Sequence, residues 1–130
     1  MAITTWESGR ESSLVDDILA GKKTIEGRLN RGKFAKYKPG DQVWLRRDYR
    51  DENGVLRDGE PRQVLVEVLA VRTYTSSLEM VTSEGFTRVM PRVGSAQAAA
   101  DGYDLYYSPA DQVKYGVLAI EFRVLSVART

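Results

Sequence analysis

The sequence contains neither cysteine nor histidine among its 130 residues. Without cysteine the protein can form no disulfide framework, thiolate nucleophile, iron–sulfur cluster or cysteine-type zinc site. Without histidine it lacks the Ser-His-Asp and Cys-His arrangements, an imidazole general base and every histidine metal ligand. Its carboxylates are scattered and form no oxygen-ligand loop, so we expect no metal and no other cofactor. Any catalysis must depend on Lys, Asp, Glu, Tyr, Ser or Thr.

Long hydrophobic runs are missing too. The most apolar stretch, Val64 to Val71, is interrupted by Glu67, and the first ten residues carry Glu7 and Arg10 in place of an apolar leader. We therefore expect no contact with a membrane and a cytoplasmic location. The length is typical of one domain, and 42% hydrophobic and 28% charged residues are typical of a soluble globular chain. A single domain over residues 1–130 is the prediction.

The formal net charge of +1 conceals an uneven distribution. The segment from Lys22 to Arg50 carries ten basic residues against three acidic ones, Glu26, Asp41 and Asp48. A basic block on a nearly neutral protein is typical of a face that meets an anion such as a nucleic-acid backbone, and equally of a solvated Lys/Arg loop. Both interpretations stay open at this point.

The first predicted elements are a helix and a strand. A helix is expected over Ser13–Ala20, because Ser13 and Asp16 have the spacing of a capping box and Gly21 suits the position after the helix. Residues 22–29 then alternate in polarity, which predicts a half-buried strand. Its polar side chains, which must face solvent or a site, are Thr24, Glu26 and Arg28.

The rest of the chain predicts a sheet with short helices. Lys38-Pro39-Gly40-Asp41 predicts a turn into a strand over 42–47, and Asn53-Gly54 and Asp58-Gly59 predict a protruding excursion. The densest run of Val and Leu, over 63–73, predicts a central strand. Helices over 77–84 and 96–107, capped by Ser76 and Ser95, and a closing strand over 117–127 complete the pattern. This is an α+β fold: a small, mostly antiparallel β-barrel with short helices at its openings.

The segment from Gly21 to Arg28 carries most of the chemically active groups. It places a glycine turn, two adjacent ammonium groups, a hydroxyl, a carboxylate and a guanidinium at one helix-to-strand junction. Folding alone does not require this combination. The simpler alternative is an exposed ion pair between Glu26 and Arg28, worth less than about 1 kcal/mol, beside solvated lysines.

This segment also resembles a known motif. A helix followed by Gly-x-Lys-x-x-Glu-x-Arg, and then a Pro-Gly-Asp turn into a strand, is similar to the signature of the ASCH domain, a family of the PUA-like superfamily. The motif is filled here by Gly21, Lys23, Glu26 and Arg28, and Lys38-Pro39-Gly40-Asp41 follows it. Later stretches that are similar to ASCH proteins, in the same order, are Val89-Met90-Pro91, Tyr106-Tyr107-Ser108 and the run from Tyr115 to Phe122. The resemblance covers most of the chain.

The resemblance implies a small β-barrel with helices at its mouth, and a site in the cleft between them. It also implies binding of RNA or nucleosides. The small bacterial ASCH proteins hydrolyse the acetyl amide of N4-acetylcytidine with a Lys, a Thr and a Glu. The Lys falls on Lys23 and the Glu on Glu84, near the end of a predicted helix. The Thr falls on position 26, where this chain has Glu26, so either the hydroxyl role passes to Thr24 or the chemistry differs.

Amide hydrolysis needs an activated water or nucleophile, a proton for the leaving amine and a group that holds the oxyanion. Lys23 can serve as a base only if its pKa falls well below about 10.4. Lys22 and Arg28 as positive neighbours favour this, whereas Glu26 favours the ammonium, so both signs stay open. Glu84 is then expected to pass the proton to the cytosine N4.

The expected catalytic residues are thus Lys23, Glu84, Thr24 and Glu26, and the expected substrate-binding residues are Arg28, Lys22, Tyr107 and Ser108. Nucleobases stack on aromatic rings, and Tyr107 with Ser108 ends the last predicted helix, where the barrel mouth is expected.

Three functions follow from these observations. The first is a metal-independent amidohydrolase that removes acyl groups from N4-acylated cytosine nucleosides, which makes a small-molecule nucleoside the first expected partner. The second is a non-catalytic RNA-binding module, whose phosphate contacts would be Lys33, Lys36, Lys38, Arg46, Arg47 and Arg50. The third is a ribonuclease that uses Lys and Glu in place of His.

Overall fold

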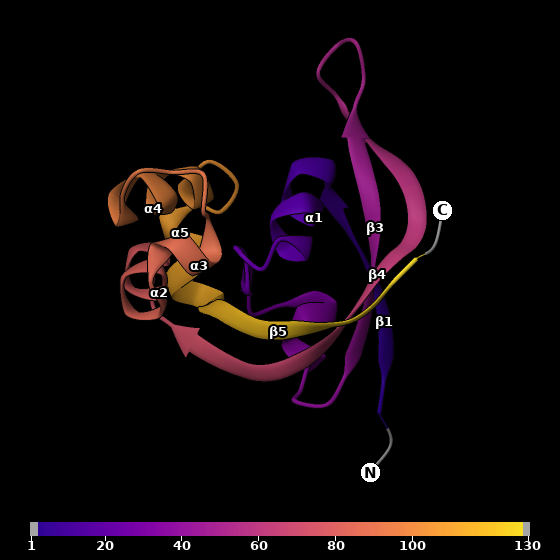
Figure 1. The fold of residues 1–130 in the computed structure, drawn as a ribbon. Coiled ribbons are helices and arrows are strands. Elements are labelled where there is room, and N and C mark those ends of the chain that lie inside the picture. Colours follow the sequence, from indigo (N-terminus) through magenta and orange to yellow (C-terminus); the bar gives the residue numbers. More distant parts are fainter. Residues whose placement is uncertain (1–2, 129–130) are drawn as a thin grey trace.

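The computed structural model describes residues 3–128, which form one five-stranded sheet (Figure 1). The strands are β1 (Thr5–Glu11), β2 (Ile25–Leu29), β3 (Gln42–Arg50), β4 (Leu56–Tyr74) and β5 (Val117–Val127). Their order in the sheet is β1-β3-β4-β5-β2, and every neighbouring pair is antiparallel except β1 and β3. The long strands β4 and β5 bend, so the mixed sheet curls into a half-barrel. The predicted α+β class and the central position of the 63–73 strand are confirmed.

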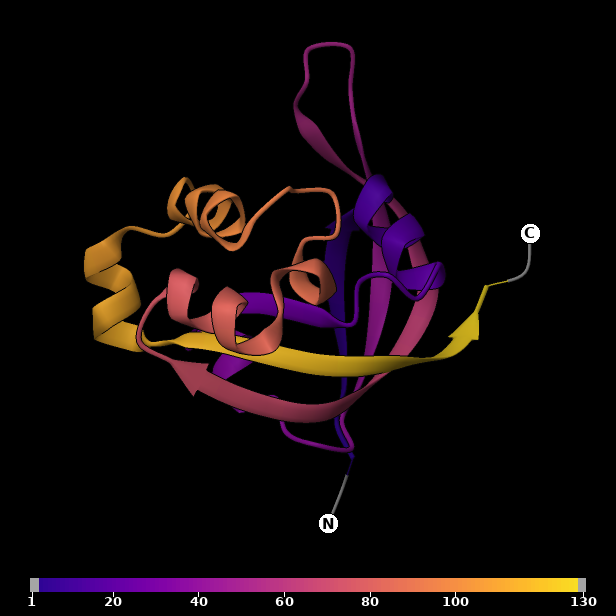
Figure 2. The ribbon, with the colours of Figure 1, turned by 60° about the vertical axis from the view of Figure 1, so that its left-hand side comes forward.

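Helices cover both ends of the half-barrel (Figure 2). α1 (Ser12–Leu19) packs on β1 and β3. The other four helices lie together at the opposite end of β4 and β5: α2 (Ser77–Glu84), α3 (Phe86–Val89), α4 (Ala96–Asp104) and α5 (Pro109–Tyr115). A short 3₁₀ helix, η1 (Gly32–Lys36), follows β2. Within residues 3–128, no helix has the length and apolar character needed to cross a membrane.

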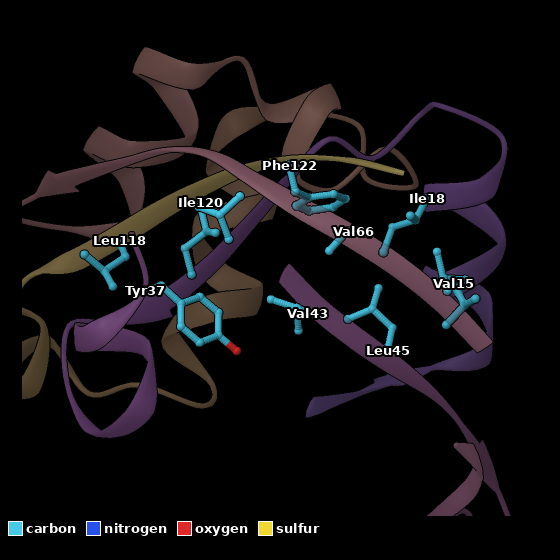
Figure 3. Close-up of a cluster of buried hydrophobic side chains, with 11 residues drawn as sticks. Val15, Ile18, Tyr37, Val43, Leu45, Val66, Leu118, Ile120 and Phe122 are labelled. Carbon is cyan, nitrogen blue, oxygen red and sulfur yellow. The ribbon is translucent and has the colours of Figure 1, made fainter. Parts of the chain in front are cut away.

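Two hydrophobic cores lie on opposite faces of β5 and β2. The first lies between α1 and the sheet (Figure 3), and the second lies beneath α2 and α4. Successive side chains of a strand point to opposite faces, so β5 sends Leu118 and Ile120 into the first core and Val117 and Ala119 into the second. Only alternate residues of strand β2 pack in the second core. The residues between them, Glu26 and Arg28, therefore point toward the inside of the half-barrel.

Local capping sets the helix boundaries at Ser76 and Ser95. Ser76 Oγ accepts a hydrogen bond from the Glu79 amide at 3.1 Å, and α2 ends at Gly85, as predicted. Ser95 caps α4 in the same way, with a 3.1 Å bond from the Ala98 amide.

Two helix predictions were wrong in detail. The helix expected over 96–107 ends at Asp104, and a separate helix, α5, begins at Pro109, because proline suits the first turn of a helix. The capping box expected at the start of α1 is absent: Glu11 holds the N-cap position without a side-chain bond, and Asp16 accepts a hydrogen bond from Arg47 Nη1 at 2.8 Å.

The predicted excursion is a hairpin that projects beyond the half-barrel (Figures 1 and 2). Its turn lies at Asn53-Gly54, and both flanking strands are longer than predicted. Asp58-Gly59 makes no turn, because these residues lie within β4 at a shift in the β3–β4 register. A Cβ on Gly59 would lie 1.9 Å from the Arg47 carbonyl oxygen, so only glycine permits this close approach.

Sequence analysis predicts no element over residues 5–11, yet β1 occupies them and pairs in parallel with β3. The predicted 38–41 turn helps to hold β1 in place. Asp41, which is fully buried, accepts hydrogen bonds from the Thr4 amide at 3.2 Å and from Trp6 Nε1 at 3.1 Å. Strand β1 therefore forms one edge of the sheet, and β2 forms the other.

Candidate active site

A cleft of about 390 Å³ lies at the seam of the half-barrel, where the edge strands β1 and β2 are not paired with each other. Helix α4 and the residues after it supply a further wall with Tyr103 and Tyr107. The charged side chains that line the cleft are Arg10, Glu11, Lys23, Glu26, Arg28 and Arg50. Four residues of the predicted site, Lys23, Glu26, Arg28 and Tyr107, therefore come together in one cavity.

Lys23 lies between the end of α1 and the start of β2. Its side chain is buried, with 2% of its surface exposed, although lysine is rarely buried without a partner. Lys23 Nζ donates hydrogen bonds to two backbone carbonyls, Ile25 O at 2.8 Å and Val89 O at 2.6 Å. The backbone amide of Lys23 also donates to Asp17 O, the carbonyl of an α1 residue, at 3.1 Å. The amine is thus held by carbonyls of β2 and α3, and the backbone of Lys23 is held by α1.

Glu26 is the centre of a buried charge cluster, which we call the seam cluster and define as Arg10, Lys23, Glu26 and Arg28. Arg10 Nε donates to Glu26 Oε2, and Arg28 Nε lies 3.7 Å from Glu26 Oε1. Arg10 Nη1 also donates to Ser8 Oγ at 2.7 Å. The Arg10–Glu26 pair joins the two edge strands. The alternative of an exposed Glu26–Arg28 pair is wrong, because Glu26 is 6% exposed.

Burial and the neighbouring charges shift the pKa values of Lys23 and Glu26. Burial lowers the pKa of Lys23 below its ordinary value; Glu26 opposes this shift, and the cations Arg10 and Arg28 add to it. The sequence left the direction of this shift open, and in the structure the net shift of the Lys23 pKa is downward. Burial alone would raise the pKa of Glu26, but Arg10, Lys23 and Arg28 outweigh it and lower that pKa to about 2. Glu26 is therefore a permanent anion at neutral pH.

Arg28 is held beside the tyrosine wall. Its guanidinium carbon lies 4.6 Å from the centre of the Phe34 ring, within cation–π distance. Its Nε is buried and has no hydrogen-bond partner among the described residues. The rings of Tyr103 and Tyr107 stack at 6.4 Å between centroids with an angle of 14°. A Cβ at Gly27 would lie 2.7 Å from the Tyr103 hydroxyl, so glycine allows this wall to pack against β2.

The structure does not bring Glu84 to the cleft lining, because its carboxylate is held in a different cluster. Arg72 donates to both carboxylate oxygens at 2.6 Å, and the Tyr74 hydroxyl donates at 2.5 Å. Arg72 also pairs with Glu121 at 2.8 Å, and Arg88 pairs with Glu121 at 3.3 Å. We call these residues the outer cluster: Arg72, Tyr74, Glu84, Arg88 and Glu121. Within this cluster Glu84 is bound to Arg72 and Tyr74, and it does not line the cleft with Lys23.

Three further site predictions also fall outside the cleft lining. Thr24 precedes β2, and its Oγ1 accepts a long 3.5 Å hydrogen bond from Arg88 Nε, so it does not share the inner face with Glu26. Lys22 is exposed in the turn after α1. Ser108 caps α5 through its Oγ, which accepts from the Asp111 amide at 3.1 Å.

The basic block does not form one continuous positive face. Its arginines and Lys38 bind nearby carboxylates, which the sequence count could not reveal: Lys38 with Asp41, Arg46 with Asp48 and Asp58, Arg47 with Asp16, and Arg50 with Glu11. Lys33 and Lys36 have no carboxylate partner in the described part of the chain, and Lys33 Nζ donates to the Glu7 carbonyl at 2.6 Å. Most of the local positive charge is thus neutralised.

Arg10 is the main site residue that sequence reasoning missed. It lies on β1, on the same strand face as Trp6 and Ser8. The polar residues Ser8 and Arg10 on this face suggest a strand that faces solvent, so the sequence gives no sign that Arg10 is buried in a site. Tyr103 is also missing from the predicted site, since tyrosines in helices are common core residues. Among residues 3–128, no group of three or more acidic side chains has the arrangement of a metal site.

Comparison with known proteins identifies the family of this chain and structures that share its fold. The profile of the ASCH domain matches residues 12–126. The chain belongs to the ASCH domain family. It is 34% identical to hypothetical protein PH0355, whose crystal structure superposes with a TM-score of 0.77 over 94% of this chain and 100% of that one. Protein PF0455 from Pyrococcus furiosus is also 34% identical, with a TM-score of 0.73 over 95% and 99% of the two chains.

A more distant ASCH protein shares the fold alone. A point mutant of ZmASCH from Zymomonas mobilis is 12% identical and has a TM-score of 0.57 over 95% of this chain and 73% of that one. The comparison with curated proteins finds no match. The predicted family and fold are confirmed, and the ASCH motif Gly21-x-Lys23-x-x-Glu26-x-Arg28 lies at the cleft.

Proposed function

We propose that this ASCH domain is a metal-independent amidohydrolase that removes the acyl group from N4-acylated cytosine nucleosides such as N4-acetylcytidine. The observation that carries the proposal is the buried Lys23 amine, fixed by two carbonyls at the wall of a cleft that also contains Arg10, Glu26 and Arg28. A lysine with a lowered pKa is a group that enzymes use as a base or nucleophile.

The hydrogen bonds of Lys23 suit the role of a base. A neutral amine has two N–H bonds and one lone pair. Two backbone carbonyls accept from Nζ, so they use both N–H bonds and leave the lone pair to take a proton. An exposed lysine would instead stay protonated at neutral pH.

The reaction then runs through one water molecule and Lys23. Lys23 Nζ takes a proton from the water as its oxygen attacks the acyl carbon, and the carbonyl oxygen becomes an oxyanion. The C–N bond to the cytosine N4 breaks, and the Lys23 ammonium returns the proton to that nitrogen. The products are acetate and cytidine. Lys23 therefore replaces Glu84 as the proton donor, because Glu84 lies in the outer cluster.

The other cleft residues stabilise charge and bind the substrate. Arg10 lines the cleft and supplies positive potential for the oxyanion. Glu26, with a pKa of about 2, holds no proton to donate at neutral pH, so we assign it the role of fixing Arg10 and Arg28. The stacked Tyr103 and Tyr107 offer an aromatic wall for the base.

The RNA-binding alternative has less support. Its strongest argument was the basic block, but four of the six residues proposed to contact phosphate are ion-paired with carboxylates. A phosphate would have to compete with those carboxylates for each contact.

Acyl release by the purified protein tests the proposal. N4-acetylcytidine is incubated with protein in the presence of a chelator, and the change in cytosine absorbance is followed. We expect acetate and cytidine in equal amounts. No turnover above background with any N4-acyl cytidine would overturn the amidohydrolase proposal, and activity that the chelator abolishes would overturn its metal independence.

A further inference from the structure

The seam cluster differs from every other ion-paired group in residues 3–128 by its surplus of positive charge. In the other groups the cations do not outnumber the carboxylates: Arg72 and Arg88 face Glu84 and Glu121 in the outer cluster, and Arg46 alone faces Asp48 and Asp58. In the seam cluster Glu26 faces Arg10, Lys23 and Arg28. Even with a neutral Lys23, two guanidiniums share one carboxylate.

Burial makes this surplus costly. Arg10 is only 6% exposed and is the closer partner of Glu26, so Arg28, at 3.7 Å from the same carboxylate, is less fully compensated. A buried charge with an incomplete counter-charge is unfavourable. A negatively charged group entering the cleft would supply the missing partner. The cleft is therefore better matched to an anionic ligand than to a neutral one.

Arg28 is the residue that can reach such a ligand. Its side chain is 25% exposed, the largest exposure in the seam cluster, and it lines the cleft. Its Nε is buried 3.7 Å from Glu26 Oε1, so the exposed part of the side chain lies away from Nε, and its guanidinium carbon lies 4.6 Å from the centre of the Phe34 ring. A guanidinium group matches the geometry of a phosphate.

The positive region continues toward η1. The Lys33 Nζ donates to the Glu7 carbonyl at 2.6 Å and has no carboxylate partner among the described residues. Burial lowers the pKa of Lys33, and the cations Arg10, Arg28 and Arg46 lower it further. Lys33 therefore lies close enough to Arg10 and Arg28 to interact with their charges, and Glu7 opposes the shift.

We propose that the substrate of this cleft carries a phosphate and that Arg28 binds it. The inference rests on the proposed function for the rest of the ligand: the acyl amide lies at Lys23, and the phosphate of the same cytosine nucleotide lies at Arg28. A free nucleoside monophosphate and an internal phosphodiester of single-stranded RNA offer the same chemistry, and binding measurements separate these two sources.

The test compares three ligands: cytidine, cytidine 5′-monophosphate and a short oligocytidine without terminal phosphates. Calorimetry measures their affinities for the wild-type protein, for Arg28→Gln and for Arg123→Gln, which removes an exposed arginine outside the cleft. We expect a phosphate-bearing ligand to bind about tenfold or more tightly than cytidine. This preference should be lost in Arg28→Gln and kept in Arg123→Gln. Preference for the monophosphate indicates a free nucleotide, and preference for the oligomer alone indicates RNA.

Inorganic phosphate provides a second measurement that does not depend on the fold of a variant. It should compete with the phosphate-bearing ligand for the wild-type protein and leave cytidine binding unchanged. Equal affinity for cytidine and both phosphorylated ligands, no binding of any ligand, or a preference that survives in a folded Arg28→Gln would overturn the inference.

These outcomes are distinct from failure of the proposed function, because binding requires no turnover. A phosphate preference without acyl release would contradict the amidohydrolase and keep the anion site. Acyl release without a phosphate preference would contradict the anion site and keep the amidohydrolase.

Discussion

The seam cluster and the outer cluster are both built around a glutamate that the sequence marks as catalytic, yet they differ in two respects. Glu84 in the outer cluster is held by Arg72, itself 38% exposed, and the carboxylates balance the arginines. Glu26 in the seam cluster is surrounded by two arginines and Lys23 and lies against a 390 Å³ cleft. Matched charges at the surface link elements of the fold. Burial, together with the two arginines, lowers the pKa of the Lys23 amine beside a cavity, which is a pattern typical of functional sites.

Removing the amine should have the largest effect on activity. We expect Lys23→Ala to lower acyl release by about 10²–10⁴-fold, the contribution of a positioned general base. Lys36→Ala, which removes an exposed lysine, should leave the rate unchanged. The measurement is the initial rate with N4-acetylcytidine at saturating and limiting concentrations. Substantial activity in a folded Lys23→Ala would show that the base lies elsewhere.

Removing the seam carboxylate should have the largest effect on stability. Glu26→Gln leaves the buried Arg10 without its counter-charge, and loss of one partner of a buried ion pair costs about 3–5 kcal/mol of unfolding free energy. Urea denaturation at neutral pH measures this.

The pH dependence of the unfolding free energy tests the same charge on Glu26. The folded pKa of Glu26, about 2, lies below its ordinary value of 4.5, so its contribution to stability is complete above pH 4.5 and is lost as the pH falls toward 2. Part of the acid sensitivity of the wild-type protein should therefore be missing in Glu26→Gln. Identical pH–stability curves for the two proteins would contradict the charge assignment.

Changing the outer cluster should separate stability from activity. Glu84→Gln removes a carboxylate that accepts from Arg72 and Tyr74, and we expect a loss of about 1–2 kcal/mol in unfolding free energy, since Arg72 is partly solvent-exposed. The rate of acyl release should not change. The pKa of Glu84 is lowered mainly by the hydrogen bonds from Arg72, so its contribution is also lost in acid. A stable Glu84→Gln protein with a greatly reduced rate would restore Glu84 as a catalytic residue.

The basic block should give the smallest effect. Neutralising Lys36 and Arg47 together removes one exposed lysine and one arginine that pairs with Asp16, for a stability change under about 1 kcal/mol. The affinity of the protein for single-stranded RNA, measured across salt concentrations, should not respond to this double variant. If these residues contacted phosphates, the slope of log affinity against log salt would become shallower by roughly 0.7 per lost contact. That result would favour the RNA-binding alternative.

Local patterns in the sequence predicted much of the fold. The Ser76 and Ser95 caps, the Asn53-Gly54 turn and the valine-rich 63–73 strand depend on neighbouring residues, and the structure confirms them. Strand β1 was missed because its pairing with β3 joins segments about 37 positions apart in register and leaves no local signal.

The same limit explains the site predictions. Lys23, Glu26 and Arg28 lie within one motif, and the structure brings them to one cleft with Tyr107. Arg10 comes from the distant β1, and its role depends on contact with Glu26 across the seam. Glu84 was assigned to the site through a resemblance, but the ion pairs that hold it away depend on Arg72 and Glu121, which no spacing in the sequence connects to it.

The central claim is that the seam cluster makes Lys23 a base, and NMR titration of the lysine side chains tests it most directly. Lys23→Met assigns the signal, and Glu26→Gln changes the charge around it. In the wild-type protein Lys23 should titrate below the ordinary lysine pKa and below the exposed lysines. In Glu26→Gln the loss of the nearest anion should lower the pKa of Lys23 further, with Asp17 the remaining carboxylate that opposes the shift. A Lys23 that titrates with the exposed lysines in both proteins would contradict the account.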